Sequence, residues 1–368
     1  MTASSAIALP ASKRREGNIE LLRIVCMLMI IGHHLAYHGV AVYAPLQANK
    51  VLATVLFSGG MTGVNCFVLI TGYFLAPFRA RRLVSILLQT LFYSVGLTLL
   101  CRWTMWRQDV TDDTVLRSAF VLSRSPYWFV TMYAALTALL PLLQPAVQRL
   151  GKRAHAWVLT VAALYLCVVP TLTLRDPASP YFHQLTWFFF LYVLGAFFRK
   201  YPCRFTRCMP LHAVIFALSL AFIALSCLWG EQYPNLFERV ASRHRFFADK
   251  NTIPQLICSC ALFLCFVNLR VRPSALLTAL SGASFGVYLI HDHGLLREMI
   301  WRTWLQIWPL CQRGDFWLWA LLIPPGLYLA CALADCLRKY ALETPLMKLL
   351  SPACQWLDSK LTDSVVSS

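Results

Sequence analysis

An arginine and a histidine share one face of the first apolar segment, "NIELLRIVCMLMIIGHHLAYHG" (residues 18–39). Arg23 and His34 are 11 residues apart, which on a helix places their side chains within about 20° of each other and roughly 16 Å apart along the axis. His33 is expected to point about 80° away, and His38 lies one turn beyond His34. The shared face offers a cation for an anionic ligand and an imidazole that can exchange protons near neutral pH.

Each of these two residues also has an ordinary structural explanation. Arg23 could extend to lipid phosphates, and His34 could be a core histidine bonded to a neighbouring backbone group. Ionisable side chains inside a membrane-spanning segment are costly and commonly functional, and their place on one face favours a site. Glu20, three residues before Arg23, could hold the guanidinium by an ion pair on the same helix.

A second candidate group lies late in the chain, where His291, Asp292 and His293 follow one another. These residues could act on the acceptor side or orient His34, or they could merely mark the outer end of a span. Tyr288 could donate a hydrogen bond, as could Tyr73 in an earlier segment, although helix packing also explains both phenols. A further ionisable pair, Asp335 and Arg338, fits an ion pair between neighbouring turns and is left outside the site.

The composition indicates a membrane protein. The 368 residues are 58% hydrophobic and only 13% charged, with a mean hydropathy of +0.59, whereas soluble domains carry roughly a quarter charged residues. The net charge of +17 is spread over short gaps between apolar runs, which indicates membrane topology and no nucleic-acid partner. The scattered cysteines form no CxxC pair, and we expect no metal site.

Ten apolar segments are long enough to span a bilayer, so we predict an all-α, polytopic fold. The linkers at 79–82, 149–153, 199–207 and 270–272 contain basic residues and no Asp or Glu, which places them and both termini in the cytoplasm. We predict a cytoplasmic N-terminal tail (1–18), a transmembrane domain (19–350) and a cytoplasmic C-terminal tail (351–368). The predicted spans are 19–40, 51–76, 83–103, 128–147, 156–173, 185–198, 211–229, 253–269, 276–296 and 316–337.

Four stretches, in order along nearly the whole chain, resemble the bacterial integral-membrane acyltransferases called acyltransferase family three. They are the Arg23-to-His34 spacing, "GVNCFVLITGYFLAPFRARR" (63–82), "WFVTMYAALTALLPLL" (128–143) and "SFGVYLIHDH" (284–293). The family is similar to the enzymes that O-acetylate surface polysaccharides. The basic turn here, Arg79-x-Arg81-Arg82, departs from the family pattern of an arginine pair followed by a third arginine three residues later.

The resemblance implies an acyl-CoA donor, usually acetyl-CoA, in the cytoplasm of a bacterial cell and a multi-pass enzyme of the inner membrane. It implies a hydroxyl of a surface polysaccharide or lipid-linked glycan as the acceptor, and no bound cofactor. His34 would be the catalytic base or a transient acyl carrier, and Arg23 would orient the donor. Arg79, Arg81 and Arg82 would bind the donor phosphates.

Other functions fit ten spans with internal charge. A transporter of a glycan or small acid commonly has two matching halves, but the second half has no counterpart of the Arg23–His34 segment. A sensory or interaction protein would leave that segment unexplained. Within the acyltransferase interpretation, the long outer linker 230–252 is a candidate for acceptor specificity.

Overall fold

The computed structural model describes residues 16–40, 47–75, 77–104, 110–123, 127–174, 180–233 and 245–366, apart from the side chains of residues 47, 180–183 and 361–366. Within these ranges the structure is helical and contains no strand. The predicted all-α class is therefore confirmed. Residues 1–15 of the predicted N-terminal tail, and 234–244 of the outer linker proposed for acceptor specificity, lie outside the described residues.

The elements follow one another along the chain, and several successive helices join end to end. The first half contains α1 (Gly17–His34), η1 (Leu35–Val40), α2 (Gln47–Phe74), α3 (Ala80–Thr104), α4 (Asp112–Ala119), α5 (Trp128–Arg149), α6 (Lys152–Ala163), η2 (Leu164–Val168), α7 (Val169–Thr173) and α8 (Pro180–Lys200). The second half contains η3 (Phe205–Arg207), α9 (Met209–Gln232), η4 (Phe246–Ala248), α11 (Ile253–Val267), α12 (Ala275–His291), α13 (Gly294–Glu298), η5 (Met299–Trp304), α14 (Ile307–Cys311), α15 (Phe316–Arg338), η6 (Lys339–Glu343), α16 (Thr344–Leu349) and α17 (Ser351–Val366).

Each of the ten predicted spans overlaps a helix. Eight helical segments of the described residues are long and apolar enough to cross a membrane, and α12 is a shorter apolar helix of 17 residues. The polytopic membrane class is confirmed, whereas ten crossings and two cytoplasmic termini stay predictions. The eight segments are 17–40, 48–74, 80–104, 128–149, 152–173, 209–232, 246–267 and 316–349.

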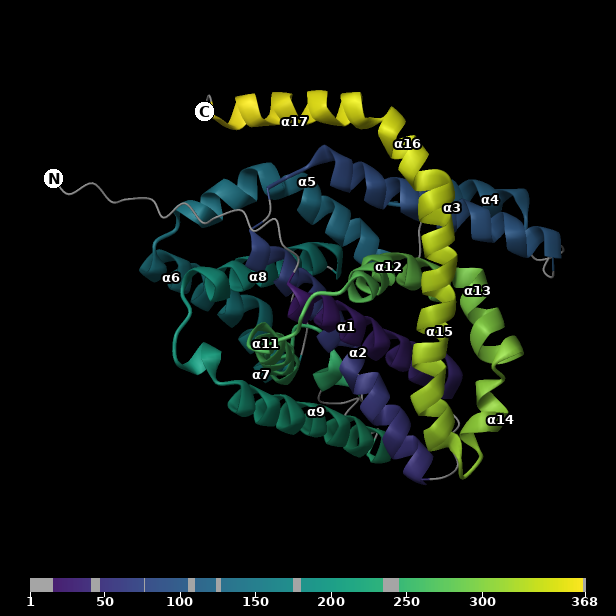
Figure 1. The fold of residues 1–368 in the computed structure, drawn as a ribbon. Coiled ribbons are helices and arrows are strands. Elements are labelled where there is room, and N and C mark those ends of the chain that lie inside the picture. The colour runs from purple at the N-terminus through teal and green to yellow at the C-terminus, as the bar shows by residue number, and fades with distance from the viewer. Residues whose placement is uncertain are drawn as a thin grey trace.

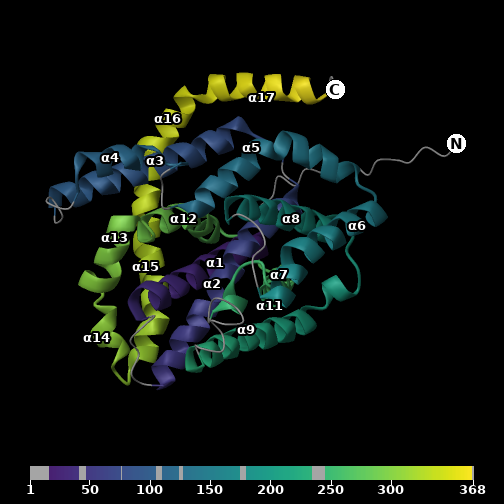
Figure 2. The same ribbon diagram turned by 180° about the vertical axis from the view of Figure 1, so that it is seen from behind.

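α1 and α2 lie at the centre of the molecule, while α9 and α17 lie at opposite edges (Figures 1 and 2). Directly after His34, α1 continues as the π-helical segment η1, an irregularity often found at functional sites. The predicted C-terminal tail contains α17, which crosses the view at a steep angle to α15 (Figure 1). Asp358 of α17 accepts a 2.7 Å hydrogen bond from the backbone N–H of Ala80, at the start of α3.

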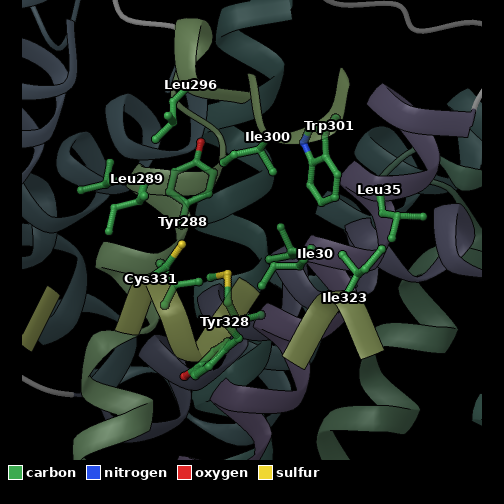
Figure 3. Close-up of a cluster of buried hydrophobic side chains, with 14 of the residues drawn as sticks. Ile30, Leu35, Tyr288, Leu289, Leu296, Ile300, Trp301, Ile323, Tyr328 and Cys331 are labelled. Atoms are coloured by element: carbon green, nitrogen blue, oxygen red, sulfur yellow. The ribbon is translucent and has the colours of Figure 1, made fainter. Parts of the chain in front are cut away.

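Two large hydrophobic clusters stabilise the bundle. One joins the later turns of α1 to α12, α15 and η5, and includes the fully buried Trp301 (Figure 3). The other joins the first turns of α1 to α2, α5, α8 and α11. The aromatic residues that pack against both clusters are Phe67, Trp128, Phe129 and Tyr133. All of them line the cavity described below.

The crossing of α2 and α8 depends on two glycines. A Cβ at Gly72 would lie 2.0 Å from the carbonyl oxygen of Tyr192, and a Cβ at Gly195 would lie 2.3 Å from that of Leu69. Backbone groups cannot move aside as flexible side chains can, so the two helices would have to separate. Only glycine allows this approach.

We therefore expect Gly72→Ala to lower the free energy of unfolding by about 1–3 kcal/mol or more, because overpacking forces the backbone apart. Thermal unfolding of the purified protein in detergent measures this change. Gly96→Ala is the matched control, since a Cβ at Gly96 meets no atom within 4 Å. Equal unfolding temperatures for the two variants would contradict the prediction.

Candidate active site

A cavity of about 500 Å³ is lined by residues of α1, α2, α3, α5 and α12. Arg23 and His34 both line it, as two side chains on one face of the first helix can. The lining residues used below are Arg23, His34, Thr71, Arg82, Ser85, Gln89, Tyr133, Ser281, Tyr288 and Asp292.

The direction of the helices gives the cavity two distinct ends. Arg23, Arg82 and Ser281 belong to the first two turns of α1, α3 and α12, and α2 contributes residues of its last turn to the same region. His34 and Asp292 stand at the opposite ends of α1 and α12. The cavity therefore has the guanidinium groups of Arg23 and Arg82 at the end predicted to be cytoplasmic and the imidazole of His34 at the other end.

Arg23 is held by its own helix and by α12. Its Nη1 donates to the two Glu20 carboxylate oxygens, at 3.3 and 3.4 Å, which confirms the predicted pair. Ser281 of α12 donates its hydroxyl to Glu20. The buried carboxylate of Glu20 thus fixes the guanidinium, whose side chain stays 29% exposed and available to an anion in the cavity.

Arg82 is the member of the predicted arginine cluster that reaches the cavity. Its Nη2 donates to the hydroxyl of Tyr133, which also lies 3.0 Å from the hydroxyl of Thr71. Arg79 and Arg81 are exposed at the same end of α3 and do not line the cavity. The structure therefore places Arg82 and Arg23 in the lining of one cavity and leaves Arg79 and Arg81 exposed outside that lining.

His34 and His291 are in direct contact. His34 Nδ1 lies 2.9 Å from His291 Nε2, and His291 Nδ1 lies 2.6 Å from the carbonyl oxygen of Val287. A carbonyl only accepts, so His291 carries its proton on Nδ1 and, when neutral, presents a lone pair on Nε2. His34 must then donate from Nδ1. Its own Nε2 keeps a lone pair and has no hydrogen-bond partner among the described residues, which is the arrangement of a base.

Asp292 lies beside this histidine pair and among other charged groups. One of its carboxylate oxygens is 3.8 Å from His34 Nδ1, 4.0 Å from His38 Nε2 and 3.6 Å from Arg297 Nη1. A carboxylate at this distance stabilises a positive charge on His34. His34, His38 and Asp292 also place one ligand atom each within 4.8 Å of the others, as a metal site would, although Arg297 beside the same oxygen opposes a second cation.

Tyr288, for which the sequence left a hydrogen-bonding role and a packing role open, has its side chain in the cavity lining. Its hydroxyl is buried beside Asp292 and makes no hydrogen bond of good geometry with the described residues. In Figure 3 the hydroxyl points away from Tyr328 and Cys331. A buried hydroxyl without a hydrogen bond of good geometry is costly. Tyr288 is therefore a candidate donor to an oxygen atom of a ligand.

His33 also lines the cavity, together with His34, although helical periodicity places the two side chains on different sides of α1. The cavity is wider than one stripe of α1, so a residue 100° round the helix still reaches its wall. Its Nδ1 lies 2.6 Å from the carbonyl oxygen of Phe57, which ties His33 to α2. His293 is likewise tied to structure, because its side chain accepts from the N–H of Leu296 and caps α13.

Several cavity and neighbouring residues were not predicted from the sequence, among them Ser85, Gln89, Tyr133 and Arg297. Arg297 carried a signal, since it is a basic residue five positions after Asp292. Tyr133 lies in the stretch 128–143 that carries the family resemblance, but nothing there singled it out. Ser85 and Gln89 sit in an apolar segment with no motif of its own, and only the packing of the helices brings these residues to the cavity.

The sequence model of acyltransferase family three, described as an acyltransferase domain, matches residues 16–335. No curated protein and no solved structure matches the chain. The matched region contains all five helices that line the cavity. With membrane-spanning helices and this family match, the chain belongs to acyltransferase family three and is a multi-pass membrane acyltransferase.

Proposed function

We propose that the protein transfers an acyl group, most simply acetyl, from cytoplasmic acyl-CoA to a hydroxyl of a cell-surface or exported glycan, in the inner membrane of a bacterium. One observation carries the proposal: a single cavity is lined by Arg23 and Arg82 at one end and by His34 at the other. Guanidinium groups suit the phosphates of the donor, and the cavity gives the acyl group a protein-lined route toward His34.

The unpartnered Nε2 of His34 supports two forms of the reaction. As a general base, it would take the proton of the acceptor hydroxyl while that oxygen attacks the thioester carbonyl. The tetrahedral intermediate then breaks its carbon–sulfur bond, and His34 returns the proton to the departing thiolate. As a nucleophile, Nε2 would attack the thioester carbonyl, and the carbon–sulfur bond would break to release CoA as its thiolate. In a second step the acceptor hydroxyl would attack the acylated ring, lose its proton to the thiolate or to water, and free Nε2.

Neighbouring groups would support either route. The His34 Nδ1–H bond to His291 fixes the ring so that Nε2 keeps its lone pair, and Asp292 lies 3.8 Å from Nδ1, where it would stabilise the imidazolium. The buried hydroxyl of Tyr288 would donate to the oxyanion that forms on the carbonyl oxygen. We propose that the exposed side chains of Arg79 and Arg81 also bind phosphates of the donor, outside the cavity.

Turnover by the purified protein tests the proposal. Incubation with acetyl-CoA labelled in its acetyl group should release CoA and move the label to an isolated surface glycan, and NMR of glycans from cells lacking the gene should show lost ester signals. A transporter of the glycan would not consume acetyl-CoA. If the purified protein releases no CoA and the ester content of the glycans does not change, the proposed function is refuted.

A donor-binding role for Arg82 gives a quantitative expectation. Arg82→Gln should raise the KM for acetyl-CoA by about tenfold, since a charge-assisted hydrogen bond contributes roughly 1.5–3 kcal/mol. The kcat should change less. Arg153→Gln, at an exposed position on the predicted cytoplasmic side, is the control. An unchanged KM in Arg82→Gln would show that Arg82 serves only to hold Tyr133.

A further inference from the structure

Two polar side chains of α3, Ser85 and Gln89, line the cavity between its cationic end and His34. They are four residues apart, so they lie on one face of the helix with a rise of about 6 Å between them. Ser85 is about one turn beyond Arg82. Neither residue belongs to the motifs that carry the family resemblance, and neither is needed for the reaction steps described above.

The hydrogen bond that Gln89 makes behind the cavity wall fixes the direction of its amide. Gln89 Nε2 donates to Asp335 Oδ1 at 2.9 Å. An ionised carboxylate only accepts, so the nitrogen of the amide must face Asp335 and the carbonyl oxygen must face the other way. That oxygen, Oε1, has no hydrogen-bond partner among the described residues and is not among their fully enclosed polar atoms.

Ser85 is oriented in the same manner. Its hydroxyl donates to Glu343 Oε1 at 2.6 Å, and the acceptor is again a carboxylate. The single hydroxyl proton of Ser85 is therefore donated to Glu343, and only the lone pairs of the hydroxyl oxygen remain for a group in the cavity. Ser85 and Gln89 thus both present hydrogen-bond acceptors to the cavity.

A buried ionic network holds both carboxylates in place. Arg338 donates to Asp335 at 2.9 Å and to Glu343 at 2.6 Å, and Tyr93 also donates to Asp335, at 2.9 Å. Gly286 of α12 leaves room for Asp335, because a Cβ there would lie 2.1 Å from the Asp335 Cγ. Because paired charges in a buried network are costly to separate, Asp335 and Glu343 stay in place and hold the acceptor oxygens of Gln89 and Ser85 in fixed positions.

We infer that Ser85 and Gln89 bind the amide N–H groups of the pantetheine arm of the donor. This inference rests on the proposed function. A pantetheine arm has two secondary amides joined by a short alkyl link, and it connects the phosphates to the thioester. The cavity presents matching groups in the same order: Arg82 for a phosphate, then two acceptors one helical turn apart, then His34 for the thioester. A ligand without N–H donors would leave both acceptors unpaired.

The test compares CoA with an analogue in which ester oxygens replace both amide N–H groups. Calorimetry of the purified wild type should show the analogue binding about threefold to tenfold more weakly for each hydrogen bond lost. Gln89→Met removes one acceptor without adding a donor. In this variant the ratio of the two dissociation constants, analogue over CoA, should therefore be about threefold to tenfold smaller than in the wild type. Ser85→Ala should do the same for the other acceptor.

Ser94→Ala is the control, because Ser94 lies on α3, bonds to the carbonyl oxygen of Ser118 and does not line the cavity. It should discriminate as the wild type does. If Gln89→Met does not fold, Ser85→Ala decides. CoA binding with no preference over the analogue, or with a preference unchanged in the variants, overturns this inference and leaves the proposed function standing. Absence of CoA binding to the wild type overturns both.

Discussion

His34→Ala is expected to lower the rate of acyl transfer by about 10²- to 10⁴-fold, the usual contribution of a general acid–base catalyst. The expectation rests on geometry. His34 Nδ1 is committed to His291, and Nε2 is left with a lone pair and no partner among the described residues. Alanine removes that lone pair. It leaves Arg23 and Arg82 in place, so the KM for the donor should change much less than kcat.

The measurement is CoA release by purified protein, with the ester content of surface glycans in complemented cells as a second readout. His155→Ala is the control. His155 is also a fully buried imidazole with one nitrogen on a backbone carbonyl, that of Val193, but it lies outside the cavity lining. The His155 variant should keep wild-type kcat per folded molecule. Wild-type turnover by His34→Ala would show that the catalytic assignment is wrong.

The same variant can separate the two forms of the reaction. If His34 carries the acyl group, labelled acetyl-CoA without acceptor should label the wild-type protein, because Nε2 would hold the group until a hydroxyl arrives. A general base leaves no such intermediate. Label on the wild type that is absent from His34→Ala supports the acyl carrier, and CoA release only in the presence of acceptor supports the base.

Contacts within one helix could be predicted from the sequence. The shared face of Arg23 and His34 and the pairs Glu20–Arg23 and Asp335–Arg338 all follow from helical periodicity. These predictions needed only the assumption that the apolar segments are helices, which their length and composition supported.

Contacts between helices could not be predicted in this way. His34 and His291 are 257 residues apart, and the sequence left open whether they meet, because periodicity gives the face of each helix and says nothing of its neighbour. For the same reason the sequence did not show that His33 reaches the cavity wall, because the width of the cavity depends on how the helices around α1 pack. Asp335 was set aside as a structural pair, yet it orients Gln89 at the cavity wall.

His291→Phe is expected to lower kcat by about 10²-fold, the loss that follows a displacement of roughly 1 Å at a reacting group. Phenylalanine fills a similar volume but cannot accept the proton of His34 Nδ1. The ring of His34 then loses the contact that keeps its proton on Nδ1 and its lone pair on Nε2. Because His291 does not line the cavity, the KM for acetyl-CoA should stay close to the wild-type value.

His291→Gln should give a result that a packing role for His291 could not explain. A glutamine carbonyl oxygen can accept from His34 Nδ1, so this variant should recover part of the lost kcat although its shape differs more from histidine than that of phenylalanine. His212→Phe is the control, since His212 is fully buried, bonds to the carbonyl of Phe205 and lies outside the cavity lining. Steady-state kinetics on equal amounts of folded protein decide the matter. If His291→Phe is as active as the wild type, or if glutamine is no better than phenylalanine, His34 does not depend on His291 for its orientation.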